Sequence, residues 1–246
     1  MDENTHAYSA NPTRNPFRYA LAVWRLIKSD PSKSTDEAAI VEMGFARSRF
    51  GRRFARWEEI IAALESDPRT AEALAARRTF GPIVLAELEP LPEGSLGRVF
   101  AEHCRSRNLD PNLIHVPPTD DVGWMLNHLY QTHDIWHVVT GWDNDLPGEV
   151  GVGTFYAGQL GSPAFFGFML ALILLNVVFR RDDLGAVMQA MSEGYRAGKA
   201  AEPLFGVAWD ELWDVPLDDL RARFGVESAG FGVSAPSVVR PMGAVA

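Results

Sequence analysis

The sequence predicts an all-α fold built as a single-domain helical bundle with an apolar interior. Apolar residues recur every three or four positions in several segments, which is the period of an amphipathic helix. These segments are bounded by Asn, Asp, Pro and Gly, the residues that begin and end helices. No stretch shows the alternating apolar pattern of a strand, and the chain of 246 residues is long enough for one large domain.

The expected organisation is a flexible N-terminus over residues 1–14, one helical domain over residues 15–226 and a C-terminal tail over residues 227–246. A first helix is predicted from Asn15-Pro16, where a cap is followed by proline at the first helical position. A capping-box spacing at Ser34-Thr35-Asp36-Glu37 begins a second helix, and Asp67-Pro68 begins a third. The tail contains Gly and Pro and has no periodicity, which favours a mobile segment.

Composition restricts the class of protein. A formal net charge of −9 argues against nucleic acid as the main partner. The single cysteine, Cys104, excludes an intramolecular disulfide and fits a reducing compartment. The acidic N-terminus resembles neither a signal peptide nor an arginine-rich transit peptide, so we expect a bacterial cytoplasmic protein.

A long helix is predicted from Val122 to Thr140. Pro117 and Pro118 keep the preceding chain extended, and Thr119 or Asp120 can cap the first backbone amides. Gly141 supplies a stop. The apolar positions follow the helical spacing and form one buried stripe: Val122, Met125, Leu126, Leu129, Trp136 and Thr140.

Two histidines of this helix are the first candidate ligands of a metal. His133 is expected on the buried stripe, and His137 lies about 40° from it on the same face. A histidine pair at this spacing is a common way for a helix to hold zinc or iron. Asp134 lies at the edge of the stripe and is either a third ligand or a partner of a ligand.

Glu149 is the expected acidic ligand. The connection over residues 141–148 is rich in turn formers and has the length that lets the next segment fold back antiparallel. Glu149 would then lie near both histidines, at a helix N-terminus that favours a carboxylate. The alternative is that the histidines are core residues bonded to backbone, with Glu149 acting only as a cap.

The order His133-Asp134-x-x-His137, followed after eleven residues by Glu149, resembles the signature of the ubiquinone (coenzyme Q) biosynthesis family called COQ-four. Residues 91–97 and 198–205, the latter followed by Trp209, also resemble this family, and the resemblance covers roughly Phe17 to Val226. It implies an all-helical protein that acts on polyprenylated benzoquinone precursors at a membrane. The four motif residues would be its metal ligands, usually discussed as zinc.

The resemblance implies one of two roles. The first is an enzyme that replaces the ring carboxyl at C1 of a polyprenylated hydroxybenzoate with a hydroxyl, with the motif residues as its catalytic centre. Zinc has no redox role, so iron(II), which also binds sets of two histidines and one carboxylate, would suit this reaction better. The second is a scaffold with a structural metal. A third, weaker alternative is a metal-dependent hydrolase with Asp134 as its general base.

The expected partners are the polyprenylated quinone precursor, other ubiquinone biosynthesis proteins and the inner face of the cell membrane, with a possible homodimer. The apolar run over residues 164–179 is too short to span a bilayer. It predicts a core helix that also suits an isoprenoid tail. An arginine-rich run between Arg47 and Trp57 either binds anionic lipid heads or forms a solvated helix face.

The C-terminal half supplies the remaining candidates. On a predicted helix from Leu184 to Ala200, Arg196 or Lys199 could bind the substrate carboxylate. The alternative is that both are exposed charges that favour the helix C-terminus. Further along, Trp209 and Trp213 are expected core anchors, and Pro216 begins a last helix.

Overall fold

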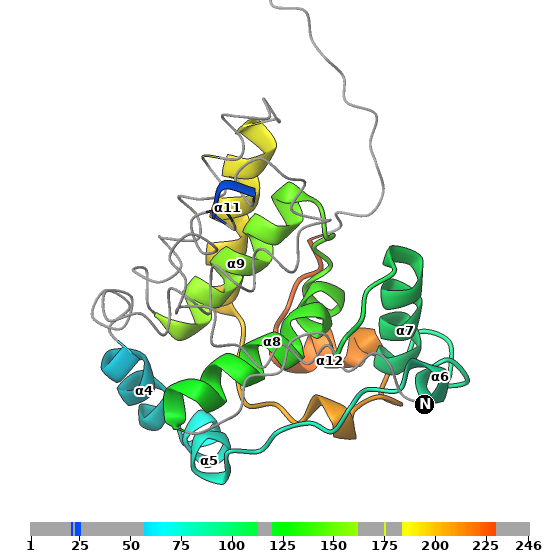
Figure 1. The fold of residues 1–246 in the computed structure, drawn as a ribbon, viewed down its shortest axis with the longest axis horizontal. Coiled ribbons are helices and arrows are strands. Elements are labelled where there is room, and N and C mark those ends of the chain that lie inside the picture. The colour runs from blue at the N-terminus through cyan, green and yellow to red at the C-terminus, as the bar shows by residue number, and fades with distance from the viewer. Residues whose placement is uncertain are drawn as a thin grey trace, which may run out of the picture.

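A computed structural model describes residues 21, 23–25, 57–112, 120–161, 175 and 184–229 (Figure 1). Within these ranges all regular structure is helical, apart from one isolated β-bridge between Ser95 and Pro216, which confirms the all-α prediction. The helices are α4 (Trp57–Ser66), α5 (Pro68–Ala76), α6 (Leu85–Leu88), α7 (Leu96–Arg107), α8 (Asp121–Thr140), α9 (Leu146–Leu160), α11 (Leu184–Ala200) and α12 (Leu217–Phe224), with a 3-10 helix at Trp209–Glu211. Within the described ranges, no helix combines the length and apolar character needed to cross a bilayer.

Several predictions concern segments outside this description. They are the flexible N-terminus, most of the first helix, the helix that begins at the capping box, the arginine-rich run, nearly all of the apolar run and the tail beyond Ala229.

Helix α8 runs through the middle of the molecule (Figure 1). It is capped by Asp120, whose side chain accepts a hydrogen bond from the Gly123 amide at 2.7 Å. It ends at Gly141 in the left-handed region, with φ of 76°, so both predicted ends are confirmed. Trp124 and Trp136 are completely buried, which makes α8 the centre of the core.

Helix α9 folds back antiparallel to α8, as predicted from the length of the connection. The Trp136 ring stacks on Tyr156 with centroids 4.2 Å apart and meets Phe155 edge-on at 5.5 Å. These rings and Glu149 all meet the same stretch of α8, and Figure 1 shows α9 running back in the opposite direction. The first turn of α9 therefore lies beside the last two turns of α8.

Helices α9 and α11 make the most extensive helix–helix contact in the described part of the chain (Figure 1). Their backbones approach closely because glycines stand at the crossing. A Cβ added to Gly194 would lie 2.2 Å from the Gly151 carbonyl oxygen, and one added to Gly198 would lie 2.3 Å from the Phe155 carbonyl oxygen. Gly194 thus meets Gly151, and Gly198 meets Phe155. Because the residue numbers on both helices increase in the same direction along the contact, the two helices run parallel.

The C-terminal part of the domain supports α8 from another side. The Arg221 guanidinium donates to the carbonyls of Val138 and Val139 at 3.0 and 2.9 Å, so it satisfies acceptors that the end of α8 leaves unpaired. Trp209 is fully buried, as expected of a core anchor, and Trp213 is half-buried with its ring 5.3 Å from Phe100. Pro216 is the N-cap of α12, which confirms the predicted last helix.

Candidate metal centre

His133 and His137 project from one face of α8, with ring centroids 4.8 Å apart. The His137 side chain is completely buried, whereas 37% of the His133 side chain is exposed. His133 was expected on the buried stripe and instead lies at its edge. The histidine pair therefore joins the core to the surface, which is where a site must lie to admit a solute.

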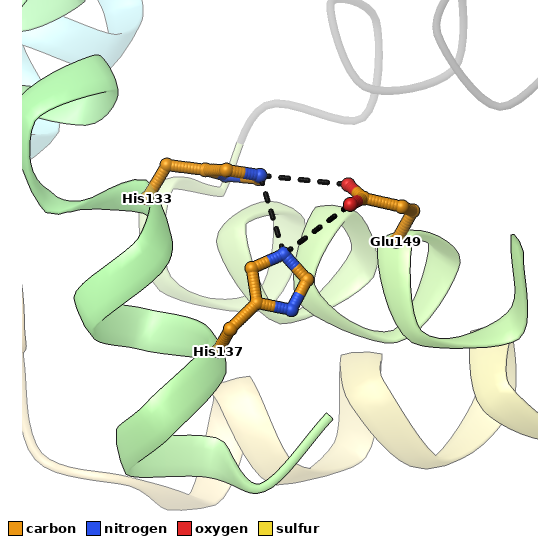
Figure 2. Close-up of side chains that lie close together, drawn as sticks. All are labelled: His133, His137 and Glu149. Atoms are coloured by element: carbon orange, nitrogen blue, oxygen red, sulfur yellow. Dashed lines mark hydrogen bonds and ion pairs between the residues drawn. The ribbon is translucent and has the colours of Figure 1, made fainter. Parts of the chain in front are cut away.

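Glu149 comes from the first turn of α9. Asp145 caps this helix by accepting a hydrogen bond from the Gly148 amide at 2.9 Å, which fixes where the first turn begins. One carboxylate oxygen of Glu149 lies 3.4 Å from His133 Nε2, and the other lies 3.5 Å from His137 Nε2. Figure 2 shows the three side chains converging from the two helices.

The ring orientation of His137 is set by the connection between α8 and α9. Its Nδ1 lies 3.0 Å from the carbonyl oxygen of Trp142. A carbonyl only accepts, so Nδ1 carries the hydrogen and donates it. The lone pair of His137 is then on Nε2, which faces His133 Nε2 at 3.2 Å. A backbone acceptor of this kind is the usual partner of a metal-binding histidine.

The spacing of these atoms fits a bound cation. Ligand atoms held about 2.0–2.1 Å from a tetrahedral zinc lie about 3.3–3.4 Å from one another. The contacts among the three residues span 3.2 to 3.5 Å, and one ligand atom from each lies within 4.8 Å of the others. Among the described residues, His133, His137 and Glu149 therefore form a donor set suited to a divalent metal.

The charge of Glu149 agrees with this assignment. Burial raises the pKa of its carboxyl, but the neighbouring His137 and His133 rings lower this pKa by more than burial raises it, so the net shift is downward. The carboxylate is therefore ionised at neutral pH. A divalent metal bound between the three residues would further stabilise this ionised and largely buried carboxylate.

Asp134 is not part of this group of ligand atoms. It is half-buried, and its negative charge acts on Cys104 of α7. Burial first, and then Asp134, raise the pKa of the Cys104 thiol to about 12. Asp134 is therefore placed toward α7, and its predicted role as a ligand or as a partner of a ligand stays a prediction.

Arg196 and Lys199 are both exposed on α11, and the backbone nitrogen of Lys199 lies in the contact with Gly158 of α9. Their predicted contact with a substrate carboxylate stays a prediction.

Three residues near the metal ligands did not follow from the sequence. Trp142 contributes a backbone carbonyl, which no side-chain pattern reveals. Tyr156 lies parallel to the His133 ring at 6.1 Å, and His103 of α7 stacks near His137 at 6.2 Å. Burial is the main cause that lowers the pKa of His103 to about 3, so this ring is neutral. His103 and Arg107 are four residues apart on α7, so they lie on the same face of that helix. This spacing could have indicated that α7 turns a polar face toward the site.

Comparisons with known proteins agree with this description. A crystal structure from Nostoc punctiforme, provisionally described as a ubiquinone biosynthesis protein, superposes with a TM-score of 0.70 at 29% identity, over 87% of this chain and 99% of that one. The mitochondrial ubiquinone biosynthesis protein COQ4 of Eremothecium gossypii is 30% identical over 57% of this chain and 44% of its own length. The mitochondrial COQ4 homologue of Rattus norvegicus is 24% identical over 66% and 63%.

The chain thus spans less than two thirds of the length of these curated relatives. The model of the coenzyme Q (ubiquinone) biosynthesis protein Coq4 family matches residues 33–230, which is most of the chain and includes all three candidate ligands. The chain therefore belongs to the Coq4 family of coenzyme Q (ubiquinone) biosynthesis proteins.

Proposed function

We propose that this protein catalyses the metal-dependent replacement of the C1 carboxyl of a polyprenylated hydroxybenzoate by a hydroxyl. The observation that carries this proposal is the number and exposure of the candidate ligands. Catalytic zinc sites take three protein ligands, whereas structural sites take four. The described residues supply three, and the His133 side chain is 37% exposed.

In this proposal His133, His137 and Glu149 hold the metal, and the Trp142 carbonyl keeps His137 Nε2 directed at it. A bound divalent metal would supply Lewis acidity toward the ring carboxylate and phenol and, if it is iron, would also supply redox chemistry. Zinc fits the ligand set, and iron(II) fits the reaction better. Arg196 or Lys199 would bind the substrate carboxylate, and Asp134 would tune the site.

The overall reaction balances with molecular oxygen as the oxidant. A 4-hydroxybenzoate ring and one O₂ give the corresponding quinone, CO₂ and water. With a two-electron donor present, the product is the hydroquinone instead. The protein would work at the inner face of the cell membrane, with other ubiquinone biosynthesis proteins and possible self-association as a homodimer.

Reconstitution tests this proposal. Metal-free protein is loaded separately with Fe(II), Co(II), Mn(II) or Zn(II) and given a polyprenylated 4-hydroxybenzoate in detergent under air. We expect at least one metal to give the decarboxylated product, detected by mass spectrometry, with none from the metal-free protein. Substrate binding without turnover under every metal would refute the enzymatic role.

A scaffold with a structural metal is the second candidate, and the surface of α11 favours it. Leu184, Met188 and Tyr195 are 53%, 50% and 48% exposed. On a helix these positions lie within about 40° of one another, so they form one apolar stripe that a partner protein or a membrane could cover. The Glu149→Gln variant separates the roles: a catalytic site loses turnover and keeps partner binding, whereas a scaffold that depends on its structural metal loses partner binding.

A further inference from the structure

We propose that Arg107, which is not a ligand, is a positioning residue for the metal site, because its ion pair with Asp143 holds the Trp142 carbonyl against His137. This inference rests on the metal site of the proposed function. It adds a path from α7, through the connection between α8 and α9, to the ligand nitrogen of His137.

The ion pair is well defined. Arg107 stands in the last turn of α7, and its Nε and one terminal nitrogen lie 2.8 and 2.5 Å from the same oxygen of Asp143. The Asn144 amide donates to that oxygen as well, at 2.8 Å. Burial raises the pKa of Asp143, but the bonds from Arg107 and Asn144 lower it overall, so this carboxylate is ionised. Both side chains of the pair are 35% exposed.

Asp143 directly follows the residue whose carbonyl binds His137. The Trp142 ring packs tightly on α9, where a Cβ added to Gly151 would lie 2.3 Å from the ring. The Trp142 carbonyl accepts the Nδ1 hydrogen of His137 at 3.0 Å. The connection is thus held by α9 through the Trp142 ring and by α7 through Arg107.

This arrangement matters because a neutral imidazole carries its hydrogen on either nitrogen. With the Trp142 carbonyl in place, the hydrogen stays on Nδ1 and the lone pair of Nε2 faces His133 and Glu149. If the carbonyl moves away, the form with hydrogen on Nε2 becomes populated, and this form cannot bind a metal through Nε2.

The sign of the expected effect separates positioning from simple charge. Arg107 is a cation near the proposed metal, so removing its charge alone would strengthen metal binding. Loss of the positioning contact would weaken it. An exposed ion pair contributes only about 0–1 kcal/mol to stability. A weaker site in a stably folded Arg107→Met protein is therefore the result that points to positioning.

The test compares Arg107→Met with Arg105→Met in the full chain. Arg105 is in the same turn of α7 and pairs with Glu89 on the surface. Arg105→Met therefore removes the same charge from the same end of the helix as Arg107→Met does. Nitrogen-15 NMR of the metal-free proteins at pH 8 reports the tautomer of His137. Competition with a chromophoric chelator then gives the Zn(II) dissociation constant.

We expect wild type and Arg105→Met to hold His137 with hydrogen on Nδ1. Arg107→Met should show a mixture and bind Zn(II) about tenfold more weakly, the lower end of the range for residues that support ligands. Arg107→Lys should recover part of the loss. If Arg107→Met does not fold, Asp143→Asn breaks the same pair and should give the same tautomer mixture.

An unchanged tautomer and unchanged affinity in Arg107→Met, with wild type binding zinc, would overturn the inference. If wild type binds none of Zn(II), Fe(II), Co(II) and Mn(II), the proposed function fails. The tautomer of the metal-free protein still decides whether Arg107 positions His137.

Discussion

Two histidines on α8 have different roles because their rings contact different groups. His137 directs Nδ1 to a carbonyl and Nε2 to other donor atoms. His128, more than two turns earlier, accepts the Gly206 amide hydrogen on Nε2 at 2.9 Å and is enclosed by the rings of Trp124 and Phe205. His128 is thus a core residue, whereas His137 is a candidate ligand.

His128 should make the fold sensitive to acid. Burial lowers its pKa to about 3 from an ordinary value of 6.5. Between these values the unfolded chain binds a proton that the folded chain excludes, so stability is lost as pH falls below about 6.5, by up to about 1.4 kcal/mol per pH unit. In metal-free protein, His128→Gln should reduce this slope in urea unfolding at pH 7.5, 6.5 and 5.5. Equal slopes for both proteins would contradict this account.

Glu149 and Asp134 make a matched pair for testing the ligand set. Glu149→Gln removes a donor that lies 3.4 and 3.5 Å from the two imidazoles, so we expect Zn(II) affinity to fall by at least about a hundredfold. Asp134→Asn should leave the metal stoichiometry unchanged, because Asp134 lies outside the group of ligand atoms. Titration calorimetry measures both. Equal losses from the two variants would show that Asp134 also binds the metal.

Helix packing explains how Glu149 reaches the histidines. Helix α9 is held between α8, through the stacked rings of Trp136 and Tyr156, and α11, through the glycine crossing. The crossing leaves no room for side chains, so α9 cannot slide without steric clash. The ligand in its first turn is positioned as a consequence.

Alanine substitutions at two glycines test this packing. At Gly194 a Cβ would lie 2.2 Å from a backbone oxygen of α9, so Gly194→Ala should destabilise the fold by about 1–3 kcal/mol or more. At Gly153 nothing lies within 4 Å, so Gly153→Ala should stabilise α9 by about 0.5–1 kcal/mol. Denaturant unfolding measures both. A tolerated Gly194→Ala would show that the two helices are not in close contact.

The sequence predicts those features that local chemistry determines. Asp120 and Gly141 mark the ends of α8, and Asp67 and Pro216 mark the starts of α5 and α12. The closeness of Glu149 to the two histidines was predicted from the length of the connection between α8 and α9. Local patterns do not reveal which helix a side chain faces. The position of Asp134 on the helix did not show that α7 lies beside it, and no pattern indicates the parallel contact between α9 and α11.

In the described part of the molecule, α8 contacts elements from both ends of the domain. At the start of α8, Asp121 forms an ion pair with Arg77, which follows α5. Near the end of α8, Arg221 of α12 donates to backbone carbonyls. The candidate ligands lie in the last two turns of this central helix. Metal binding should therefore stabilise the whole domain rather than one loop.

Thermal unfolding with and without metal tests this coupling. A metal present at about 100 times its dissociation constant stabilises the folded state by about 2.7 kcal/mol. For a domain of this size that corresponds to a rise of about 5–10 °C in Tm. Zn(II) should raise the Tm of wild type and not that of Glu149→Gln, and a chelator should reverse the rise. Equal shifts in both proteins would place the stabilising metal elsewhere.

The most direct test is anomalous diffraction at the zinc edge from crystals of the full chain soaked in Zn(II). We predict a peak about 2.0–2.2 Å from His133 Nε2, His137 Nε2 and a carboxylate oxygen of Glu149. An ordered site with no peak at this position, or a Glu149 carboxylate far from both rings, would contradict the metal centre.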